Sequence, residues 1–260
     1  MPGHNNWFQV NHKELTEPFK FTYTLPESYN PMPFQAAADY TARCLAEMYS
    51  KLHLCFSGGL DSEFVGEVFV RNNIPFVPVI LDCEMTKLES SRAFEWCDSK
   101  SIEPYVIEYL DNEKLVLDII RLAHIIQETP DVGIVPMIID EFIPGANLVT
   151  GFGDPFVVDD IVGDDVILES HDFYLEANTN HPGAFFTYTP ELFFASINDI
   201  DRSLHAQTAK SNLYGIPNRP KLMQILDFGQ YSHASHHYIT LGNLGKNVTW
   251  IGNLEDLTHT

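Results

Sequence analysis

The sequence predicts an α/β protein with an open parallel β-sheet, helices on both faces of the sheet and a mainly helical C-terminal cap. This prediction rests on the alternation of two kinds of segment along the chain. Short apolar runs alternate along the chain with longer segments in which apolar residues recur at helical spacing. Strands that alternate with helices in this way are typical of parallel sheets, because each helix carries the chain back to the starting edge.

Shifts in composition divide the chain into three segments. Residues 1–34 are rich in aromatic residues, proline and asparagine, and their apolar pieces at 7–10 and 19–24 predict two short strands, in a hairpin or at a sheet edge. Residues 35–170 carry the strand–helix alternation and are expected to form the α/β domain. Residues 171–260 are expected to form the cap, packed on the same domain.

The elements of the α/β domain are expected in a regular order. Apolar runs predict strands at residues 52–56, 74–81, 103–108 and 147–150. Helical spacing predicts helices at residues 35–51, 63–71, 88–100, 111–127 and 132–142. Asp111 is expected to cap the fourth of these helices.

After residue 155 the pattern changes. Three short apolar pieces predict a small β excursion, at residues 156–158, 166–168 and 173–175. In the cap, a helix is expected to begin at residues 189–192, and a second helix is expected at residues 197–206.

Length and composition describe a folded globule. A chain of 260 residues can form one large domain or one domain with an appendage, and 45% hydrophobic content argues against disorder. The sequence shows no apolar run long enough for a membrane span and no signal segment, so a cytoplasmic location is expected. The four cysteines lie far apart without a Cys-x-x-Cys pair, which favours buried side chains over zinc ligands or disulfides.

The formal net charge of −21 limits the class of partner. Nucleic-acid binding draws most of its affinity from Lys and Arg on phosphates, and a strongly acidic protein repels polyanions. Lys and Arg are sparse and scattered here, 15 in all. The charge therefore argues against a large nucleic-acid substrate, and a small molecule or a partner protein is expected.

The stretch Ser57-Gly-Gly-Leu-Asp-Ser62 lies between a predicted strand and a predicted helix. Paired glycines allow the backbone to approach a bulky anion, and the start of a helix offers unpaired N–H groups at its positive dipole end. Ser57, Ser62 and these amides are suited to hold phosphate, and Asp61 is suited to hold its magnesium ion. The alternative is an ordinary tight turn between a strand and a helix.

This stretch resembles the pyrophosphate loop, SGGxDS, of the N-type ATP pyrophosphatases in the adenine nucleotide alpha-hydrolase-like superfamily. The nearest motif is that of the asparagine synthetase group. The resemblance implies that ATP binds to residues 57–62 and is cleaved between its α and β phosphates. It implies catalytic roles for Ser57, Asp61 and Ser62, and phosphate contacts from Gly58, Gly59 and Leu60. It further implies that Leu81 or Asp82, at the end of the second strand, contacts adenosine through the backbone.

A second glycine turn, Gly151-Phe-Gly-Asp154, follows the strand at residues 147–150. Ligands of open parallel sheets bind outside the carboxyl ends of the strands, so this turn is expected to face the first loop. It resembles the Gly-x-Gly-x-Asp-Glu turn of the asparagine synthetase group, which implies that Gly151 and Gly153 bind nucleotide and that Asp154 binds magnesium. Asp154 comes one residue early and Pro155 stands where the family often has an acid. A turn aspartate before proline is the alternative.

Other polar residues have less defined roles. The resemblance implies a cation near the phosphates, for which the candidates are Lys87, Arg92, Lys210, Lys221 and Lys246. The histidines of the segment 232–237 match no zinc spacing, and a polar loop is favoured over a metal or substrate site. The acidic pairs 159–160 and 164–165 are interpreted as solvated turns.

The resemblance implies an ATP-dependent ligase that adenylates a carboxylate, amide or related carbonyl of an acceptor and releases pyrophosphate. An amine or ammonia would then displace AMP. No cysteine follows Cys97, which disfavours a sulfate reductase, and paired cysteines typical of thiolases and the zinc cluster of deazaguanine synthases are absent. Two alternatives remain: a non-catalytic nucleotide-binding module, and a nitrogen- or sulfur-transfer enzyme whose nucleophile comes from a partner.

Overall fold

The computed structural model describes most of the α/β domain and parts of both flanking segments. The described residues are 8–11, 20–83, 87–126, 135–151, 181–201, 203–218, 238–241 and 248–251. Several sequence predictions lie outside them: Gly153, Asp154, Lys221, Lys246, both acidic pairs, the β excursion and the histidine segment 232–237.

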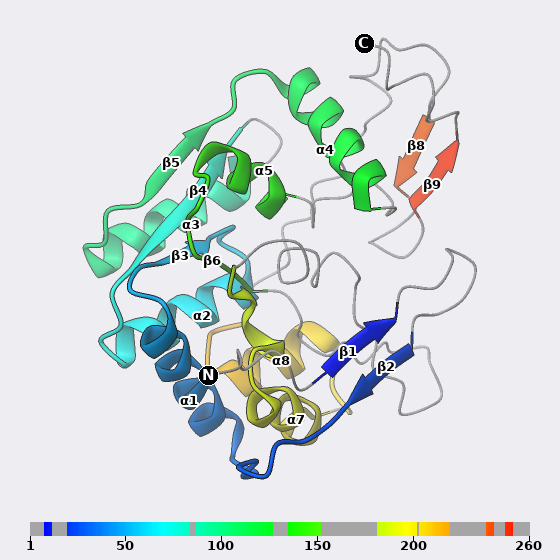
Figure 1. Ribbon diagram of the computed structural model, residues 1–260. Helices are drawn as coiled ribbons and strands as arrows, with labels where there is room; N and C mark the ends of the chain where they lie inside the picture. Colours follow the sequence, from blue (N-terminus) through cyan, green and yellow to red (C-terminus); the bar gives the residue numbers. More distant parts are fainter. Residues whose placement is uncertain are drawn as a thin grey trace.

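The centre of the fold is a five-stranded sheet in the order β5-β4-β3-β6-β7, in which every pair of neighbours is parallel (Figure 1). Its strands are β3 (Leu52–Cys55), β4 (Phe76–Asp82), β5 (Tyr105–Glu108), β6 (Leu148–Thr150) and β7 (Gly183–Ala184). The parallel sheet expected from the sequence is confirmed, and the four expected strands form within two residues of their predicted bounds.

The direction of the strand order changes at β3. From β3 the chain adds β4 and β5 on one side, and it then returns to add β6 and β7 on the other. The adjacent strands β3 and β6 therefore send their outgoing connections to opposite sides. In open α/β sheets, the crevice at such a switch point is where ligands bind. The stretch 57–62 follows β3, and Gly151 follows β6, so both belong to this crevice.

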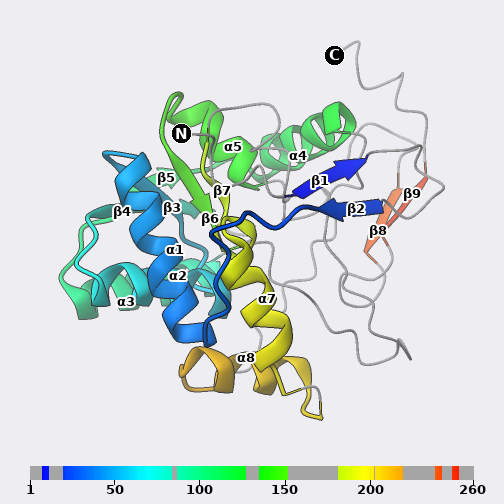
Figure 2. The same ribbon diagram turned by 60° about the horizontal axis from the view of Figure 1, so that its bottom comes forward.

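Helices cover both faces of the sheet, as the sequence predicts (Figure 2). On β3, Leu54 faces the cluster made by α1 (Phe34–Met48), α2 (Leu60–Arg71) and α3 (Lys87–Lys100). The next residue, Cys55, faces the cluster made by α4 (Asn112–Ile126) and α5 (Val135–Phe142). Successive strand residues point to opposite faces, so a nearly continuous apolar strand is the correct pattern for a central position.

The chain after residue 180 adds to the same body. Strand β7 joins the sheet edge beside β6, and a 3-10 turn (Phe185–Thr187), α7 (Pro190–Asp199) and α8 (Ala206–Tyr214) follow. The predicted helix start at 189–192 is confirmed, since Thr189 Oγ1 accepts a hydrogen bond from the Leu192 N–H at 3.3 Å. The predicted cap at Asp111 is also confirmed, because its Oδ1 accepts from the Lys114 N–H at 3.0 Å.

The predicted helix at residues 197–206 is wrong. Helix α7 ends at Asp199, whose Oδ2 accepts a hydrogen bond from the Phe34 N–H at 2.7 Å and so caps α1. Asp201 Oδ1 then accepts from the Ser203 N–H at 3.0 Å, which closes a turn. The bond made by Asp201 is local, and such side-chain bonding to the nearby backbone competes with helical structure. The next helix begins only at Ala206.

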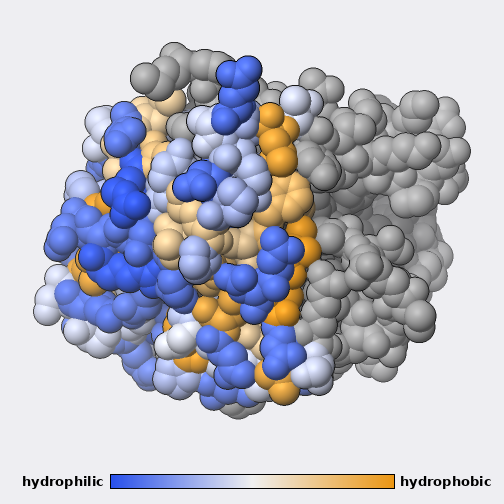
Figure 3. Space-filling model, turned by 90° about the horizontal axis from the view of Figure 1, so that it is seen from below, coloured by the Kyte–Doolittle hydropathy of each residue, from blue (hydrophilic) through white to orange (hydrophobic). Residues whose placement is uncertain are grey.

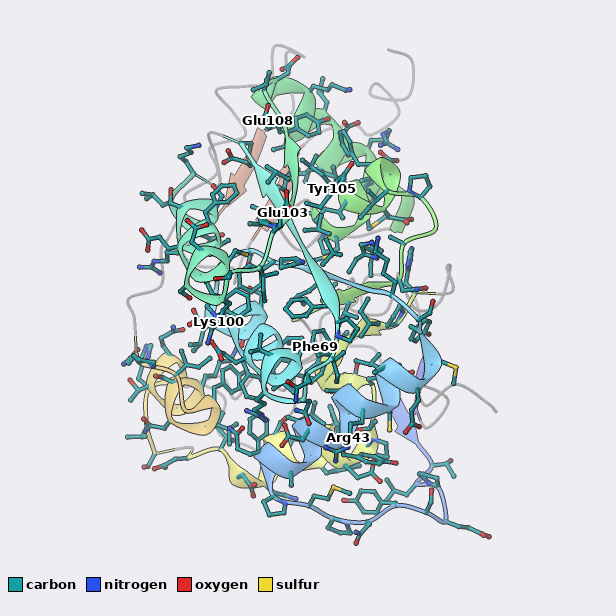
Figure 4. All side chains as sticks on the ribbon, turned by 90° about the vertical axis from the view of Figure 1, so that its left-hand side faces the viewer. Arg43, Phe69, Lys100, Glu103, Tyr105 and Glu108 are labelled. Atoms are coloured by element: carbon teal, nitrogen blue, oxygen red, sulfur yellow. The ribbon has the colours of Figure 1, made fainter. Side chains whose placement is uncertain are left out.

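The outer strand β5 is an exposed edge of the sheet (Figure 4). Tyr105 is 47% exposed, and Glu103 and Glu108 lie near the two ends of the strand. Carboxylates along an edge strand oppose pairing with another chain, because like charges would come together.

Two short hairpins complete the described residues. Strands β1 (Phe8–Asn11) and β2 (Lys20–Tyr23) pair antiparallel, which confirms the two strands predicted near the start of the chain. Strands β8 (Tyr238–Leu241) and β9 (Val248–Ile251) form a second antiparallel pair, which was not predicted. Among the described residues, no helix combines the length and apolar character needed to cross a bilayer.

Polar and charged side chains cover much of the described surface (Figure 3), with hydrophobic residues gathered in a band across the same face. This distribution agrees with a sequence that contains 36 acidic residues.

Candidate functional site

The loop between β3 and α2 depends on glycine at residue 58 for two reasons. Gly58 has a φ of +80°, a backbone conformation that side chains with a Cβ rarely adopt. A Cβ at this position would also lie 2.4 Å from the Glu89 carbonyl oxygen and 2.8 Å from the Ala93 nitrogen, both in α3. The loop is therefore packed against the backbone of α3, and any side chain would separate them.

Three hydrogen bonds within the loop fix its two serines. The Gly59 N–H donates to Ser57 Oγ at 3.2 Å, and Ser62 Oγ donates to the Gly59 carbonyl at 3.1 Å. The two hydroxyl oxygens, Ser57 Oγ and Ser62 Oγ, lie 3.1 Å apart. Either hydroxyl can donate to the other across this contact. The predicted pair of serines is thus brought together across the turn.

The start of α2 adds a set of donors at the same place. Gly59 is the N-cap and no side chain caps the helix, whose first turn contains Leu60, Asp61 and Ser62. The first N–H groups of a helix have no partner inside it, and they lie at the positive end of the helix dipole. This geometry suits an anion that approaches the carboxyl end of β3.

Gly151 brings the end of β6 against this first turn. A Cβ on Gly151 would lie 2.8 Å from the Ser62 nitrogen and 3.0 Å from the Asp61 carbonyl carbon. The two glycine-containing turns that the sequence analysis singled out therefore meet in the structure, as far as the second turn is described.

Asp61 is held by helix α8. Its Oδ1 accepts a hydrogen bond from the Tyr214 hydroxyl at 2.7 Å, and the Lys210 ammonium lies 3.2 Å from Oδ1 and 3.4 Å from Oδ2. The Lys210 side chain is only 9% exposed, whereas that of Asp61 is 33% exposed. A nearly buried cation thus lies beside the loop, and Asp61 stays accessible from the crevice.

This contact distinguishes Lys210 from the other candidates for the cation near the phosphates. Lys210 lies at the loop, 149 residues away from its partner in the sequence. Lys87 instead pairs with Asp82 at 3.2 Å and is 63% exposed. Arg92 is a partly buried residue of α3. Of the candidates among the described residues, Lys210 is the one whose ammonium contacts the loop carboxylate.

The end of β4 shows which backbone groups face the crevice. The Asp82 carbonyl accepts a hydrogen bond from the Tyr109 N–H at 2.9 Å, on the side of β5. Backbone groups alternate along a strand, so those of Leu81 point to the opposite side, toward β3 and its loop. Leu81 is therefore better placed than Asp82 for a backbone contact in the crevice. The Asp82 side chain accepts from Ser90 Oγ at 2.8 Å and ties β4 to α3.

Cys55, two residues before the loop, is not suited to act as a nucleophile. Burial raises the pKa of its thiol to about 12, and the Asp140 carboxylate adds to the shift. A thiol with this pKa remains protonated at neutral pH, and the thiolate is the reactive form. All four cysteines are free and buried, as the sequence analysis expects.

The residues present are compatible with a magnesium ion bound together with phosphate. The described part of the chain has no group of three His, Cys, Asp or Glu side chains arranged for a metal. Magnesium at nucleotide sites is commonly held by one or two carboxylates, phosphate oxygens and water. Asp61 offers a one-third exposed carboxylate, whose Oδ2 lies 3.4 Å from the Lys210 ammonium.

No family model matches the chain, and no curated protein matches it. Among solved structures, an NH3-dependent NAD synthetase from Campylobacter jejuni, determined with nitrate, is 17% identical, with a TM-score of 0.32. The match covers 45% of this chain and 56% of that synthetase, so this chain spans little more than half of its length.

Two further solved structures are similar to a larger share of the chain. A predicted tRNA methyltransferase subunit from Methanocaldococcus jannaschii is 14% identical over 67% of this chain and 94% of that one, with a TM-score of 0.35. An NMN synthetase from Francisella tularensis is 13% identical over 79% and 95%, with a TM-score of 0.37. Identities and TM-scores this low give no basis for transferring an activity.

At the level of fold, the resemblance noted in the sequence is confirmed by this chain's own structure. The SGGxDS stretch connects the central parallel strand to a helix, and the strand order reverses beside it. One residue of this site, Tyr214, was missed by sequence reasoning. The only signal for it is its spacing of four from Lys210, which places both side chains on one face of a helix.

Proposed function

We propose that this chain is an ATP pyrophosphatase-type ligase that adenylates a carboxylate, amide or related carbonyl of a small-molecule or protein acceptor. The observation that supports this proposal most directly is the meeting of three features at the switch point. These are the glycine loop with its two serines, the uncapped start of α2, and the nearly buried ammonium of Lys210.

The three features are complementary to a polyphosphate. Backbone N–H groups of α2 and the serine hydroxyls donate hydrogen bonds, and Lys210 supplies a compact positive charge. The protein as a whole carries a formal charge of −21, so an anionic nucleotide needs such a local reversal of charge. The backbone of Leu81 would contact the adenosine portion, on the β4 side of the loop.

In the proposed reaction, an oxygen of the acceptor attacks the α-phosphorus of ATP. The bond from this phosphorus to the oxygen bridging to the β-phosphate breaks, and pyrophosphate leaves with the bonding electron pair. An amine or ammonia then attacks the activated carbonyl carbon. The bond from this carbon to the acceptor oxygen breaks, and AMP leaves carrying that oxygen.

The side chains of the site act on the charge of the leaving group. Ser57, Ser62 and the amides of residues 58–62 would donate to pyrophosphate oxygens, and Lys210, held beside Asp61, would add its positive charge. Donors fixed before reaction stabilise developing charge without reorganisation. Asp61 would hold magnesium, with Asp154 as a second ligand. When bound, the ion neutralises charge on phosphate oxygens.

The test is incubation with ATP labelled at the α-phosphate, with magnesium, and with or without a pool of amino acids and cell metabolites. The proposal predicts AMP and pyrophosphate that depend on the pool and disappear in Asp61→Ala. Formation of ADP would show that a different bond is cleaved. ATP binding without turnover in any pool fraction would instead indicate a nucleotide-binding module.

A further inference from the structure

We propose that Tyr214 is a positioning residue for Asp61, which fixes the carboxylate so that one oxygen is presented to magnesium in the nucleotide complex. This inference rests on the proposed function, and it adds a residue of α8 that no loop motif contains. The observations that carry it are the hydrogen bond to Asp61, the rigid aromatic packing of the Tyr214 ring, and the closure of α8 directly after this residue.

The hydroxyl of Tyr214 selects one oxygen of Asp61. It donates to Oδ1 at 2.7 Å, and the Lys210 ammonium also lies closer to Oδ1, at 3.2 Å, than to Oδ2, at 3.4 Å. Two donors on one oxygen set the rotation of the carboxylate group. Oδ2 is then the oxygen left to coordinate a cation, which would replace the longer of the two ammonium contacts.

The Tyr214 ring cannot easily move away from this position. It stacks on Phe64 of α2 with ring centroids 4.4 Å apart and planes inclined by 19°. Phe34 of α1 and Phe186 also stack on it, at 5.7 Å and 5.6 Å. Four rings from four separate segments thus form one block in the buried cluster beside the loop. Because Phe64 lies three residues after Asp61 on α2, the block ties the hydroxyl to the helix that carries its acceptor.

The end of α8 is closed directly after Tyr214. Gly215 adopts a φ of +69°, and its N–H donates to the Asn212 carbonyl at 3.3 Å. The Ile216 N–H donates to the Ser211 carbonyl at 3.1 Å. This pair of bonds is the usual glycine closure of a helix, and it fixes the last helical residue. Lys210 and Tyr214, four residues apart, therefore reach Asp61 from one face of a closed helix, which packs on α2.

The decisive variant is Tyr214→Phe, which keeps the ring and removes the hydroxyl. Binding of an ATP analogue with a methylene group between its α- and β-phosphorus atoms is measured by calorimetry, with magnesium and with EDTA. The analogue cannot release pyrophosphate, so the readout is independent of turnover. The ratio of the two affinities measures the coupling between magnesium and nucleotide.

We expect Tyr214→Phe to lower this ratio about tenfold, as fits the loss of one hydrogen bond to a charged group. Its affinity for the analogue in EDTA should match that of the wild type. The matched control is Tyr188→Phe, which removes a hydroxyl from the same buried cluster and should leave the ratio unchanged. The melting temperature of each variant reports whether the ring block remains packed.

The outcomes separate the two proposals. If the wild type binds the analogue and Tyr214→Phe shows the same ratio of affinities as the wild type, the role of Tyr214 is overturned and the proposed function stays intact. Equal loss of affinity with magnesium and with EDTA would assign Tyr214 to packing only, and also overturns it. Failure of the wild-type protein to bind the analogue under either condition overturns both proposals.

Discussion

Replacing Gly58 with alanine tests how closely the loop depends on α3. The substitution has two costs. Holding alanine at a φ of +80° costs about 1–2 kcal/mol. The new Cβ would also lie 2.4 Å and 2.8 Å from backbone atoms of α3, which have no side-chain freedom to yield, and forced overpacking costs about 1–3 kcal/mol. We expect a total loss of about 2–5 kcal/mol in the free energy of unfolding.

Gly145→Ala is a matched control for the backbone cost alone. Gly145 has a φ of +78°, and a Cβ there would meet nothing within 4 Å. The free energy of unfolding of both variants is measured by urea denaturation, and ATP binding by calorimetry. Gly145→Ala should lose only about 1–2 kcal/mol and bind ATP as the wild type does. Equal destabilisation by the two substitutions, with ATP binding retained in Gly58→Ala, would refute the contact between the loop and α3.

Three further predictions concern named contacts. Asp61→Ala should lower the free energy of unfolding by about 1–3 kcal/mol, because the nearly buried Lys210 loses the carboxylate that lies beside it. Adding Lys210→Met should restore part of this loss in urea denaturation but no activity. Thr189→Ala should lower the free energy of unfolding by about 1–2 kcal/mol in the same assay, since it removes the cap of α7 and the 2.6 Å hydrogen bond to Thr41. A urea midpoint equal to that of the wild type would contradict this prediction. Cys55 should resist alkylation at pH 8 in the native protein, because its raised pKa keeps the thiol protonated; rapid labelling seen by peptide mass spectrometry would show that the centre of the sheet opens.

Much of the fold could be predicted because its signals are local. The strands around the loop are short apolar runs bounded by polar turns, and the pattern fixed β3 and β4 to within two residues. The local geometry of the stretch 57–62 could be predicted because the strand, the glycine turn and the helix start are contiguous in the sequence. Gly151 could be placed beside it because carboxyl ends of parallel strands share one edge of a sheet.

The remaining features depend on contacts between distant segments. Strand β7 has two residues, too few for any periodicity, and it is defined by its pairing with β6. The end of α7 is set by the bond between Asp199 and the start of α1, 165 residues apart, so a local reading of 197–206 as helix failed. Likewise, apart from its spacing of four from Lys210, no property of the segment around Tyr214 indicates that its hydroxyl meets Asp61, 153 residues earlier.

The distance along the chain between Asp61 and its partners in α8 has a consequence for biosynthesis. Lys210 follows Asp61 by 149 residues, which a ribosome adds in roughly 7–30 s at the usual rates of elongation. During that time β3, its loop and α2 are already made, but the ammonium and the phenol that hold Asp61 are not. A nascent chain that has begun to form its sheet therefore still lacks the Lys210 ammonium beside its loop. Under the proposed function, binding of a nascent chain to immobilised nucleotide would show that synthesis has passed α8, rather than only that the sheet has formed.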